Sequence, residues 1–351
     1  MRPDEEASPR YGRGTGRPMN DGTRLRAHAP RNVLIAGVPR SGTTWIGKTL
    51  GEAPGVRYLH EPDNWRVDPM AWIGMRGTGS RPSYSVGERA PDYHRMWELA
   101  FAGGWPEDNA HIDELLRLAR SQRLPRALRL ILLRRAARAA IRQASTSDER
   151  IVIKSVFATL TVEWIASEFD TEVVIVWRHP LNIVPSWIER GWTDARAMAS
   201  APAFKERFDG SGVWPPPVAD DVQGVAWAVC AYSTMMIETA ARNDAWPLIS
   251  HERLSMEPIA GFRELFDRLD IPWTSSVEAA ILGANRPGSG FETNRIAADE
   301  AMRWRARLSS EDQARAVDIV RTFERVSPAA AALWPTSPAV KSDAGANPSI
   351  L

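Results

Sequence analysis

The sequence predicts an α/β fold in which a parallel sheet is flanked by helices and carries a mainly helical inserted cap. Short apolar runs alternate with helical patterns, and continuous runs of Val, Ile and Leu are typical of strands that are covered on both faces. The chain has 351 residues, of which 44% are hydrophobic, so it can bury the core of a large domain. The predicted strands are residues 32–38, 150–153, 172–177 and 246–250.

Composition divides the chain into a domain with two tails. Residues 1–31 and 336–351 contain few large apolar side chains, and such segments cannot bury enough surface to offset the entropy of ordering. We predict that both are disordered and that residues 32–335 form the domain. Within it, the strand pattern stops over residues 66–148, where loops with Gly, Pro and Trp precede an arginine-rich helical stretch. This segment is the predicted cap.

The overall composition excludes several classes of protein. Lys and Arg number 44 and Asp and Glu 43, so net charge gives no argument for a nucleic-acid partner. The single cysteine, Cys230, cannot form an internal disulfide, and no Cys/His cluster has the spacing of a structural zinc site. The sequence has no apolar stretch long enough to span a membrane and no apolar segment at its start. We therefore expect a cytoplasmic protein.

The first predicted strand runs into a glycine-flanked turn, Gly37 to Gly42, which opens a helical pattern. Such a turn presents backbone N–H groups and the positive end of a helix dipole to an anion. Its spacing matches the nucleotide-binding P-loop, so we expect a P-loop-type sheet. The position of the usual P-loop lysine is occupied by Thr43, however. A purely structural turn remains the alternative.

Two parts of a nucleoside triphosphatase are missing. The P-loop lysine reaches the β- and γ-phosphates, and an Asp at the end of a later strand helps to hold Mg²⁺. Here the strand 172–177 ends in Arg178, and another arginine, Arg40, lies inside the turn. The absence of the lysine and the aspartate, together with the presence of these two arginines, indicates a ligand with two separate anionic groups and no metal.

These motifs resemble those of the sulfotransferases that use 3′-phosphoadenosine 5′-phosphosulfate (PAPS). Pro39 to Trp45 is similar to the 5′-phosphosulfate motif of that family, and Arg178 with Ser186 is similar to its 3′-phosphate motif. Residues 251–273 also resemble a family stretch. The resemblance covers residues 32–334 in outline, with the cap unmatched, and it implies that PAPS is the cosubstrate.

The resemblance also implies roles for the motif residues. The phosphosulfate would be held by five residues of the loop, Trp45 would lie against the adenine, and Arg178 and Ser186 would hold the 3′-phosphate. Core packing is the alternative for Trp45, and a surface ion pair is the alternative for Arg178. The five loop residues are Arg40, Ser41, Gly42, Thr43 and Thr44.

Sulfuryl transfer needs a base for the acceptor proton and a cation near the leaving oxygen. Lys154, at the end of the strand 150–153, is one of four lysines, and it is our candidate for the leaving oxygen. Cytosolic members of the family have K-T-H at what looks like this position, with the histidine as base, whereas Val156 stands here. In Golgi-type members a glutamate near the position of Glu61 is the proposed base. We predict Glu61 as the base, with neighbouring His60 as the second candidate.

Other residues near these motifs have less specific expectations. His179 is expected to turn toward local backbone groups, and Glu252 to pair with a nearby arginine. A Gly/Arg-rich segment before the last helix could close over the 3′-phosphate, although the family motif is not present in it. Its candidates are Arg286, Arg295, Arg303 and Arg305.

The cap and the tryptophans near it give the indications of the acceptor. Residues 112–143 contain nine arginines against two acidic residues, interleaved with leucines, so the stretch is both basic and apolar. It fits either two core-packed helices or a basic amphipathic surface for anionic lipid or a lipophilic acceptor. Tryptophans fall in or near the presumed acceptor loops, and they could stack on a hydrophobic or sugar-bearing substrate. They are Trp65, Trp72, Trp187, Trp192 and Trp214.

We therefore predict an enzyme that sulfates a hydroxyl of a bulky small molecule, lipid-linked or glycosylated, as in natural product biosynthesis, with peripheral membrane contact open. Two other functions also remain open. One is a P-loop kinase of a small molecule, against which the missing lysine and aspartate argue. The other is a nucleotide-binding protein without catalytic activity.

Overall fold

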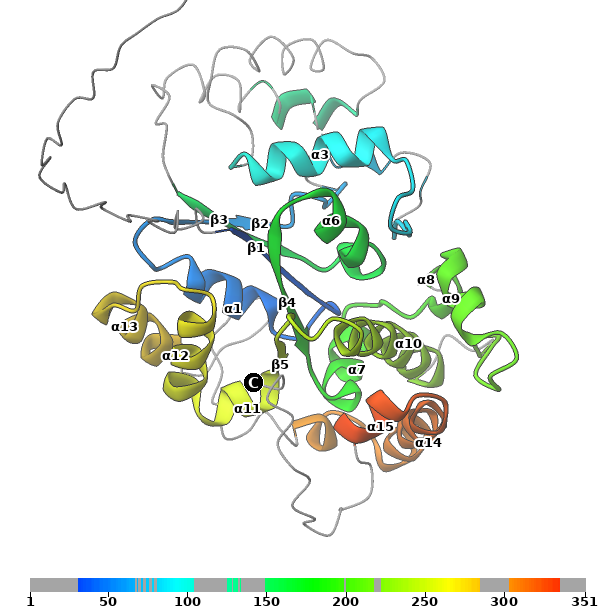
Figure 1. Cartoon of the computed structure of the whole chain (residues 1–351). Helices are drawn as coiled ribbons and strands as arrows, with labels where there is room; N and C mark the ends of the chain where they lie inside the picture. Colours follow the sequence, from blue (N-terminus) through cyan, green and yellow to red (C-terminus); the bar gives the residue numbers. More distant parts are fainter. Residues whose placement is uncertain are drawn as a thin grey trace, which may run out of the picture.

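A computed structural model of the chain describes residues 31–66, 81–103, 149–198, 200–217, 222–284 and 303–334, with scattered positions in 68–78 and 125–133. Its centre is a five-stranded, all-parallel sheet of order β2-β3-β1-β4-β5 (Figure 1). The predicted α/β class is confirmed. The strands are β1 (Asn32–Gly37), β2 (Val56–His60), β3 (Arg150–Ser155), β4 (Thr171–Trp177) and β5 (Leu248–Ser250).

Four of these strands coincide with the predicted apolar runs, whereas β2 was not predicted. Its sequence, VRYLH, is no continuous Val/Ile run, because an edge strand is only partly covered. Its pairing with β3 brings His60 opposite Lys154. The edge strand thus delivers the residues after it to the carboxyl end of β3.

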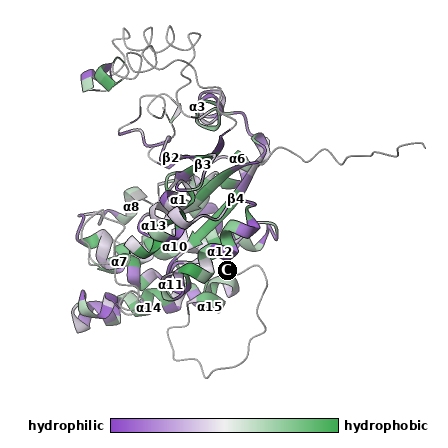
Figure 2. Ribbon diagram, turned by 90° about the vertical axis from the view of Figure 1, so that its left-hand side faces the viewer, coloured by the Kyte–Doolittle hydropathy of each residue, from purple (hydrophilic) through white to green (hydrophobic). Residues whose placement is uncertain are grey.

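Each face of the sheet has its own apolar cluster. Side chains alternate along β1, so Val33 and Ile35 belong to one cluster and Leu34 and Ala36 to the other. One face is covered by α1 (Thr43–Leu50), α11 (His251–Met256), α12 (Pro258–Arg268) and α13 (Ser275–Ala284). The other is covered by α3 (Pro91–Phe101), α6 (Val162–Glu168), α7 (Pro180–Ile188) and α10 (Val222–Ala241). Figure 1 shows these helices around the sheet, and Figure 2 shows hydrophobic residues along strands such as β4.

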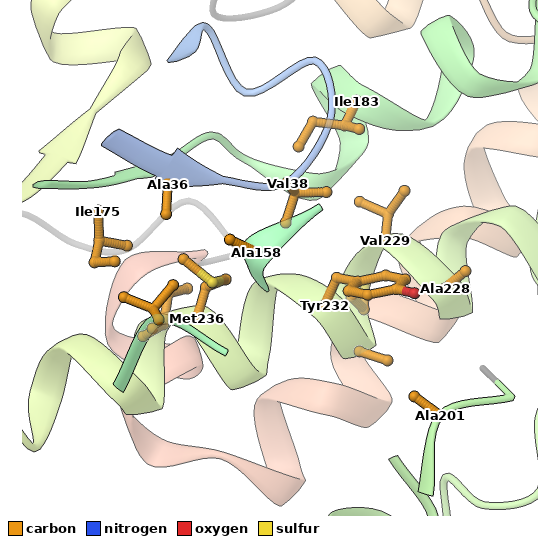
Figure 3. Packing of buried hydrophobic residues seen from close by; sticks show 14 of the residues in the cluster. Ala36, Val38, Ala158, Ile175, Ile183, Ala201, Ala228, Val229, Tyr232 and Met236 are labelled. Carbon is orange, nitrogen blue, oxygen red and sulfur yellow. The ribbon is translucent and has the colours of Figure 1, made fainter. Parts of the chain in front are cut away.

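The longest of the described helices, α10, is apolar on all sides and almost wholly buried, as expected of a helix enclosed by others. Figure 3 shows its residues Ala228, Val229, Tyr232 and Met236 among side chains from the sheet and the phosphate loop. It packs against α7, α14 (Ser310–Val326) and α15 (Pro328–Leu333), and against the 3₁₀ turn η1 (Ala158–Leu160). The remaining elements are α8 (Ala195–Met198), α9 (Pro202–Phe208) and the 3₁₀ turn η3 (Arg303–Ala306).

The described part of the predicted cap packs onto the sheet through α3. Tyr93 of α3 is buried and its hydroxyl lies 2.8 Å from Thr161 Oγ1, and Trp164 Nε1 donates to the Glu88 carbonyl at 2.9 Å. Most of the arginine-rich stretch and both tails, except Arg31, lie outside the described residues. Leu130 and Leu133, which belong to that stretch and are described, are 50% and 45% exposed. Among the described helices, none is both long and apolar enough to cross a membrane.

Candidate active site

The phosphate loop joins β1 to α1 and depends on glycine at both ends. Gly42, the N-cap of α1, has φ +97°, and a Cβ there would lie 2.1 Å from Cδ2 of His251. A Cβ on Gly37 would lie 2.6 Å from both Ser41 Oγ and the Val176 carbonyl oxygen. Arg40 also has a positive φ, of 77°. These close approaches explain the glycine spacing seen in the sequence.

Ser41 lies in this loop, just before the N-terminus of α1. Its side chain is fully buried, and its hydroxyl has no hydrogen-bond partner in the described residues. An unsatisfied buried hydroxyl costs about 1–3 kcal/mol. An anion at the N-terminus of α1 would accept this hydrogen bond and also meet the helix dipole.

The second predicted anion motif lies directly against the first. Arg178 Nη1 donates to the Arg40 carbonyl at 3.2 Å, and Arg40 Nε donates to Ser186 Oγ at 3.0 Å. Trp187 Nε1 also donates to the Pro39 carbonyl at 3.0 Å. Two motifs 138 residues apart in sequence are therefore one cluster at the carboxyl ends of β1 and β4.

The third group consists of Glu61 and Lys154, which form a buried ion pair. Their side chains are 13% and 3% exposed, and the Glu61 amide donates to the Lys154 carbonyl at 2.8 Å. Asn64 Nδ2 donates to the other carboxylate oxygen of Glu61 at 3.0 Å. Because β3 is hydrogen-bonded to β1, this pair lies beside the strand that runs into the phosphate loop. Glu61, predicted as the base, and Lys154, predicted to lie near the leaving oxygen, thus contact each other.

Comparison with known proteins shows that residues 30–275 match the model of the sulfotransferase family. The chain belongs to the sulfotransferase family. It is an enzyme of that family with a P-loop-like core. No curated protein matches the chain.

Solved structures similar to this sulfotransferase include the sulfotransferase domain from the curacin biosynthetic pathway, with 13% identity and a TM-score of 0.44 over 83% of this chain and 97% of that domain. The sulfotransferase domain of the Synechococcus PCC 7002 olefin synthase has 14% identity and a TM-score of 0.41, covering 83% and 94%. Sulfotransferase STF9 from Mycobacterium avium has 17% identity and a TM-score of 0.38, covering 85% and 78%.

The electrostatics of the ion pair set the protonation of the sulfotransferase site. Burial acts to raise the pKa of Glu61, but the Lys154 ammonium outweighs it, so the pKa lies below its usual value. Burial lowers the pKa of Lys154, against the pull of Glu61, and the positive charge of Arg40 adds to that lowering. The Glu61 carboxylate is therefore ionised and is held by the lysine at rest.

His60 is close to this pair but is oriented by another residue. Its Nδ1 lies 2.8 Å from the Tyr58 hydroxyl, and its Nε2 lies 3.9 Å from Glu61 Oε2. Burial and Lys154 lower its pKa, although Glu61 opposes them. Because the side chain is half exposed and Glu61 lies between it and the lysine, His60 remains the second candidate for the base.

Asp63 and Ser155 were not predicted as parts of the site. Ser155 Oγ donates to Asp63 Oδ2 at 2.5 Å and accepts from the amides of Phe157 and Ala158 at 3.0 Å. Asp63 is fully buried, and burial raises its pKa to about 7, against the hydrogen bond from Ser155. The bond joins the loop after β2 to the last residue of β3. The sequence could have indicated both residues by their position, because Asp63 is two residues after Glu61 and Ser155 directly follows Lys154.

Glu252 and His179 behave as expected from the sequence. Glu252 Oε1 lies 3.9 Å from Arg178 Nε, and it accepts from the His179 amide at 3.0 Å and from Asn182 Nδ2 at 2.9 Å. His179 caps α7, with its Nδ1 accepting from the Leu181 amide at 3.2 Å. Burial lowers the pKa of His179 to about 4. Glu252 therefore orients Arg178, and neutral His179 is part of the helix cap.

Trp45 packs against the helices that cover its face of the sheet. Its ring meets Phe262 edge to face at 5.0 Å between centroids, and it meets His251 at 6.1 Å. The residue is half-buried, and its Nε1 has no hydrogen-bond partner in the described part of the chain. The packing alternative therefore accounts for part of its surface, while the adenine contact stays a prediction.

The tryptophans predicted near the acceptor, and the arginines predicted to close over the 3′-phosphate, lie in different parts of the structure. Trp187 is buried and packs against Trp192, with 5.9 Å between centroids. Trp214 packs against Trp227 at 6.0 Å, and Trp65 has Arg66 over its ring at 5.3 Å. Arg303 and Arg305 lie on η3. Trp72, Arg286 and Arg295 lie outside the described residues.

Proposed function

We propose that this sulfotransferase moves the sulfuryl group of PAPS to a hydroxyl of a bulky small molecule, lipid-linked or glycosylated. The observation that carries this proposal is the buried ion pair of Glu61 and Lys154 beside the phosphate loop. A carboxylate and an ammonium at the ends of adjacent strands can remove a proton from one oxygen and stabilise negative charge on another.

In this proposal the donor occupies the cluster of the two anion motifs. Arg40, Ser41, Gly42, Thr43 and Thr44 bind the 5′-phosphosulfate, and the unpartnered hydroxyl of Ser41 supports this. Arg178 and Ser186 bind the 3′-phosphate, because a guanidinium presents two parallel donors to phosphate oxygens. Trp45 offers the adenine the part of its ring that α12 leaves uncovered.

The proposed transfer uses the ion pair as a coupled acid and base. Glu61 accepts the acceptor hydroxyl proton as the acceptor oxygen bonds to sulfur and the bond from sulfur to the phosphate oxygen breaks. Lys154 neutralises the charge on that departing oxygen. When Lys154 turns to it, Glu61 loses the ammonium that lowers its pKa and becomes a stronger base.

Calorimetry and a transfer assay test the proposed function. The protein is expected to bind PAPS and 3′-phosphoadenosine 5′-phosphate (PAP) without added metal, and to transfer labelled sulfate to members of a hydroxyl acceptor panel. Tight binding and hydrolysis of ATP with Mg²⁺, without PAPS binding, would instead indicate the kinase alternative. PAPS binding without transfer to any acceptor would indicate a protein that has lost its chemistry.

A further inference from the structure

Arg81, from the segment between β2 and α3, reaches the residues that follow the catalytic lysine. Its Nη1 donates a hydrogen bond to the carbonyl of Val156, two residues after Lys154. The centre of its guanidinium lies 5.1 Å from the ring centroid of Phe157 and 5.1 Å from that of Tyr232. A carbonyl and two aromatic rings therefore fix the position of this cation.

The position lies at the edge of the proposed active site. Tyr232 is on α10, beside η1 of the loop after β3 (Figure 3). Its ring centroid is 6.4 Å from that of Trp187, whose Nε1 donates to the Pro39 carbonyl of the phosphate loop. Arg81 is thus linked to the lysine strand on one side and to the phosphate loop on the other.

Among the described residues, no protein group compensates its charge. Lys154 is paired with Glu61 and Arg178 lies near Glu252, but no carboxylate of the described residues forms an ion pair with Arg81. The edge of the guanidinium formed by Nε and Nη2 has no hydrogen-bond partner within the described part of the chain. A cation that is partly removed from water without a counter-charge is costly unless a ligand supplies one. Two N–H groups on one edge form the fork that binds a carboxylate or phosphate.

We propose that Arg81 binds an anionic group of the acceptor, a carboxylate or a phosphate, and so selects hydroxylated acids over neutral alcohols. This inference rests on the proposed function of the same site. The fixed position of Arg81 sets a preferred separation between the anionic group and the hydroxyl that is sulfated. The rings of Phe157 and Tyr232 strengthen the site by cation–π attraction and exclude water from it.

The test uses ω-hydroxyalkanoates of graded chain length and their methyl esters. The hydroxyl is the same in each pair, so only the anionic group differs. Binding to the full chain saturated with PAP is measured by calorimetry, and sulfation is measured with labelled PAPS. The variants are Arg81→Gln, Arg81→Lys and, as a matched control, Arg263→Gln, which removes an arginine that stacks on Trp273 and pairs with Glu278.

At the best chain length the acid should bind about 10–100-fold more tightly than its ester, the range expected for hydrogen bonds to a charged group. Arg81→Gln should abolish that preference and leave ester binding and PAP affinity unchanged. Arg81→Lys should keep part of the preference, and Arg263→Gln should keep all of it.

Three results would overturn the inference while PAP binding is intact. One is equal binding, or absence of binding, of acid and ester at every chain length in the wild-type protein. Another is an equal loss of acid and ester binding in Arg81→Gln, which would mark a purely structural arginine. The third is a loss of PAP affinity in Arg81→Gln, which would show that Arg81 binds the donor and not the acceptor. Absence of PAP binding in the wild-type protein would instead reject the proposed function.

Discussion

Glu61 and Lys154 contact each other twice, through a backbone hydrogen bond of 2.8 Å and through a buried side-chain ion pair. The backbone contact fixes the loop after β2 against the end of β3. The side-chain contact makes the protonation of one residue depend on the position of the other. The proposed base and the proposed leaving-group cation therefore act as a unit.

Glu61→Gln should lower turnover by about 10²–10⁴-fold, because the amide cannot accept the acceptor proton. PAP affinity, measured by calorimetry, should change little. Lys154→Ala should lower turnover as well, and the double variant should lose much less than the product of the two single losses, as for residues that act together. His60→Ala is the control and should stay active. An active Glu61→Gln beside an inactive His60→Ala would assign the base to His60.

Arg178→Ala should weaken PAP binding by roughly 2 kcal/mol or more, because a charge-assisted contact to phosphate is lost. Glu252→Gln should have a smaller effect in the same direction, since it removes the carboxylate that orients the arginine. The control is Arg263→Gln on α12. Calorimetric titration with PAP measures all three, and unchanged affinity in Arg178→Ala would place the 3′-phosphate elsewhere.

Gly42→Ala should abolish PAP binding. The new methyl group would meet the His251 ring at 2.1 Å, and φ of +97° is strained for alanine. Gly55→Ala is the matched control, because Gly55 also has a positive φ, of +73°, but has open space around it. The control should bind PAP normally and lose only about 1 kcal/mol of stability from backbone strain. If both variants bound PAP equally well, the close packing of the phosphate loop against α11 would be irrelevant to binding.

Asp63 should make stability depend on pH. Its pKa of about 7 in the folded protein lies above the unfolded value of 3.8, so the folded state retains a proton that the unfolded state loses as pH rises. Stability should fall from about pH 4 to about pH 7 and then level off. Asp63→Asn lacks this loss because its amide does not titrate. Between pH 4 and pH 7 the free energy of unfolding of the variant, relative to that of the wild-type protein, should therefore increase by on the order of 4 kcal/mol. Urea unfolding at several pH values measures it, and a difference independent of pH would contradict the buried, protonated carboxyl.

The arginine-rich cap stretch should bind anionic vesicles at low salt. Leu130 and Leu133 are exposed, as on an amphipathic surface without a protein partner in the described residues. Replacing Arg134, Arg135 and Arg138 with Gln should release the protein from vesicles in a co-sedimentation assay, while PAP affinity stays unchanged. Vesicle binding that is absent, or unaffected by these substitutions, would favour helices that only pack.

The strands and the phosphate loop could be predicted because their causes are local. A strand buried on both faces needs a continuous Val/Ile run, and the φ of +97° at Gly42 favours glycine at that position. The edge strand β2 was not predicted because its side chains are only partly buried, so its sequence contains no continuous Val/Ile run.

The contacts within the site depend on pairings that are distant in sequence. The register that sets His60 opposite Lys154 joins segments separated by the whole cap, so the pairing of Glu61 with Lys154 could not be read from either motif. Likewise, the sequence around Asp63 indicates only a loop, and the hydrogen bond from Ser155 to its carboxyl group is seen only in the folded structure. The site around Arg81 could not be predicted either, because it is formed by contacts with Phe157 and with Tyr232 on a later helix.

The parallel pairing of β2 with β3 determines how much chain the connection between them needs. A parallel return must travel back along the sheet by one strand length, and β2 has five residues, which span about 17 Å. The single helix α3, with 11 residues, is also about 17 Å long and already covers that distance. Apart from Glu61 and Asp63 of the candidate site, the remainder of the connection is surplus to the topology. We therefore expect that evolution or a designer can exchange it for another module and, under the proposed function, change the acceptor while leaving the donor site in place.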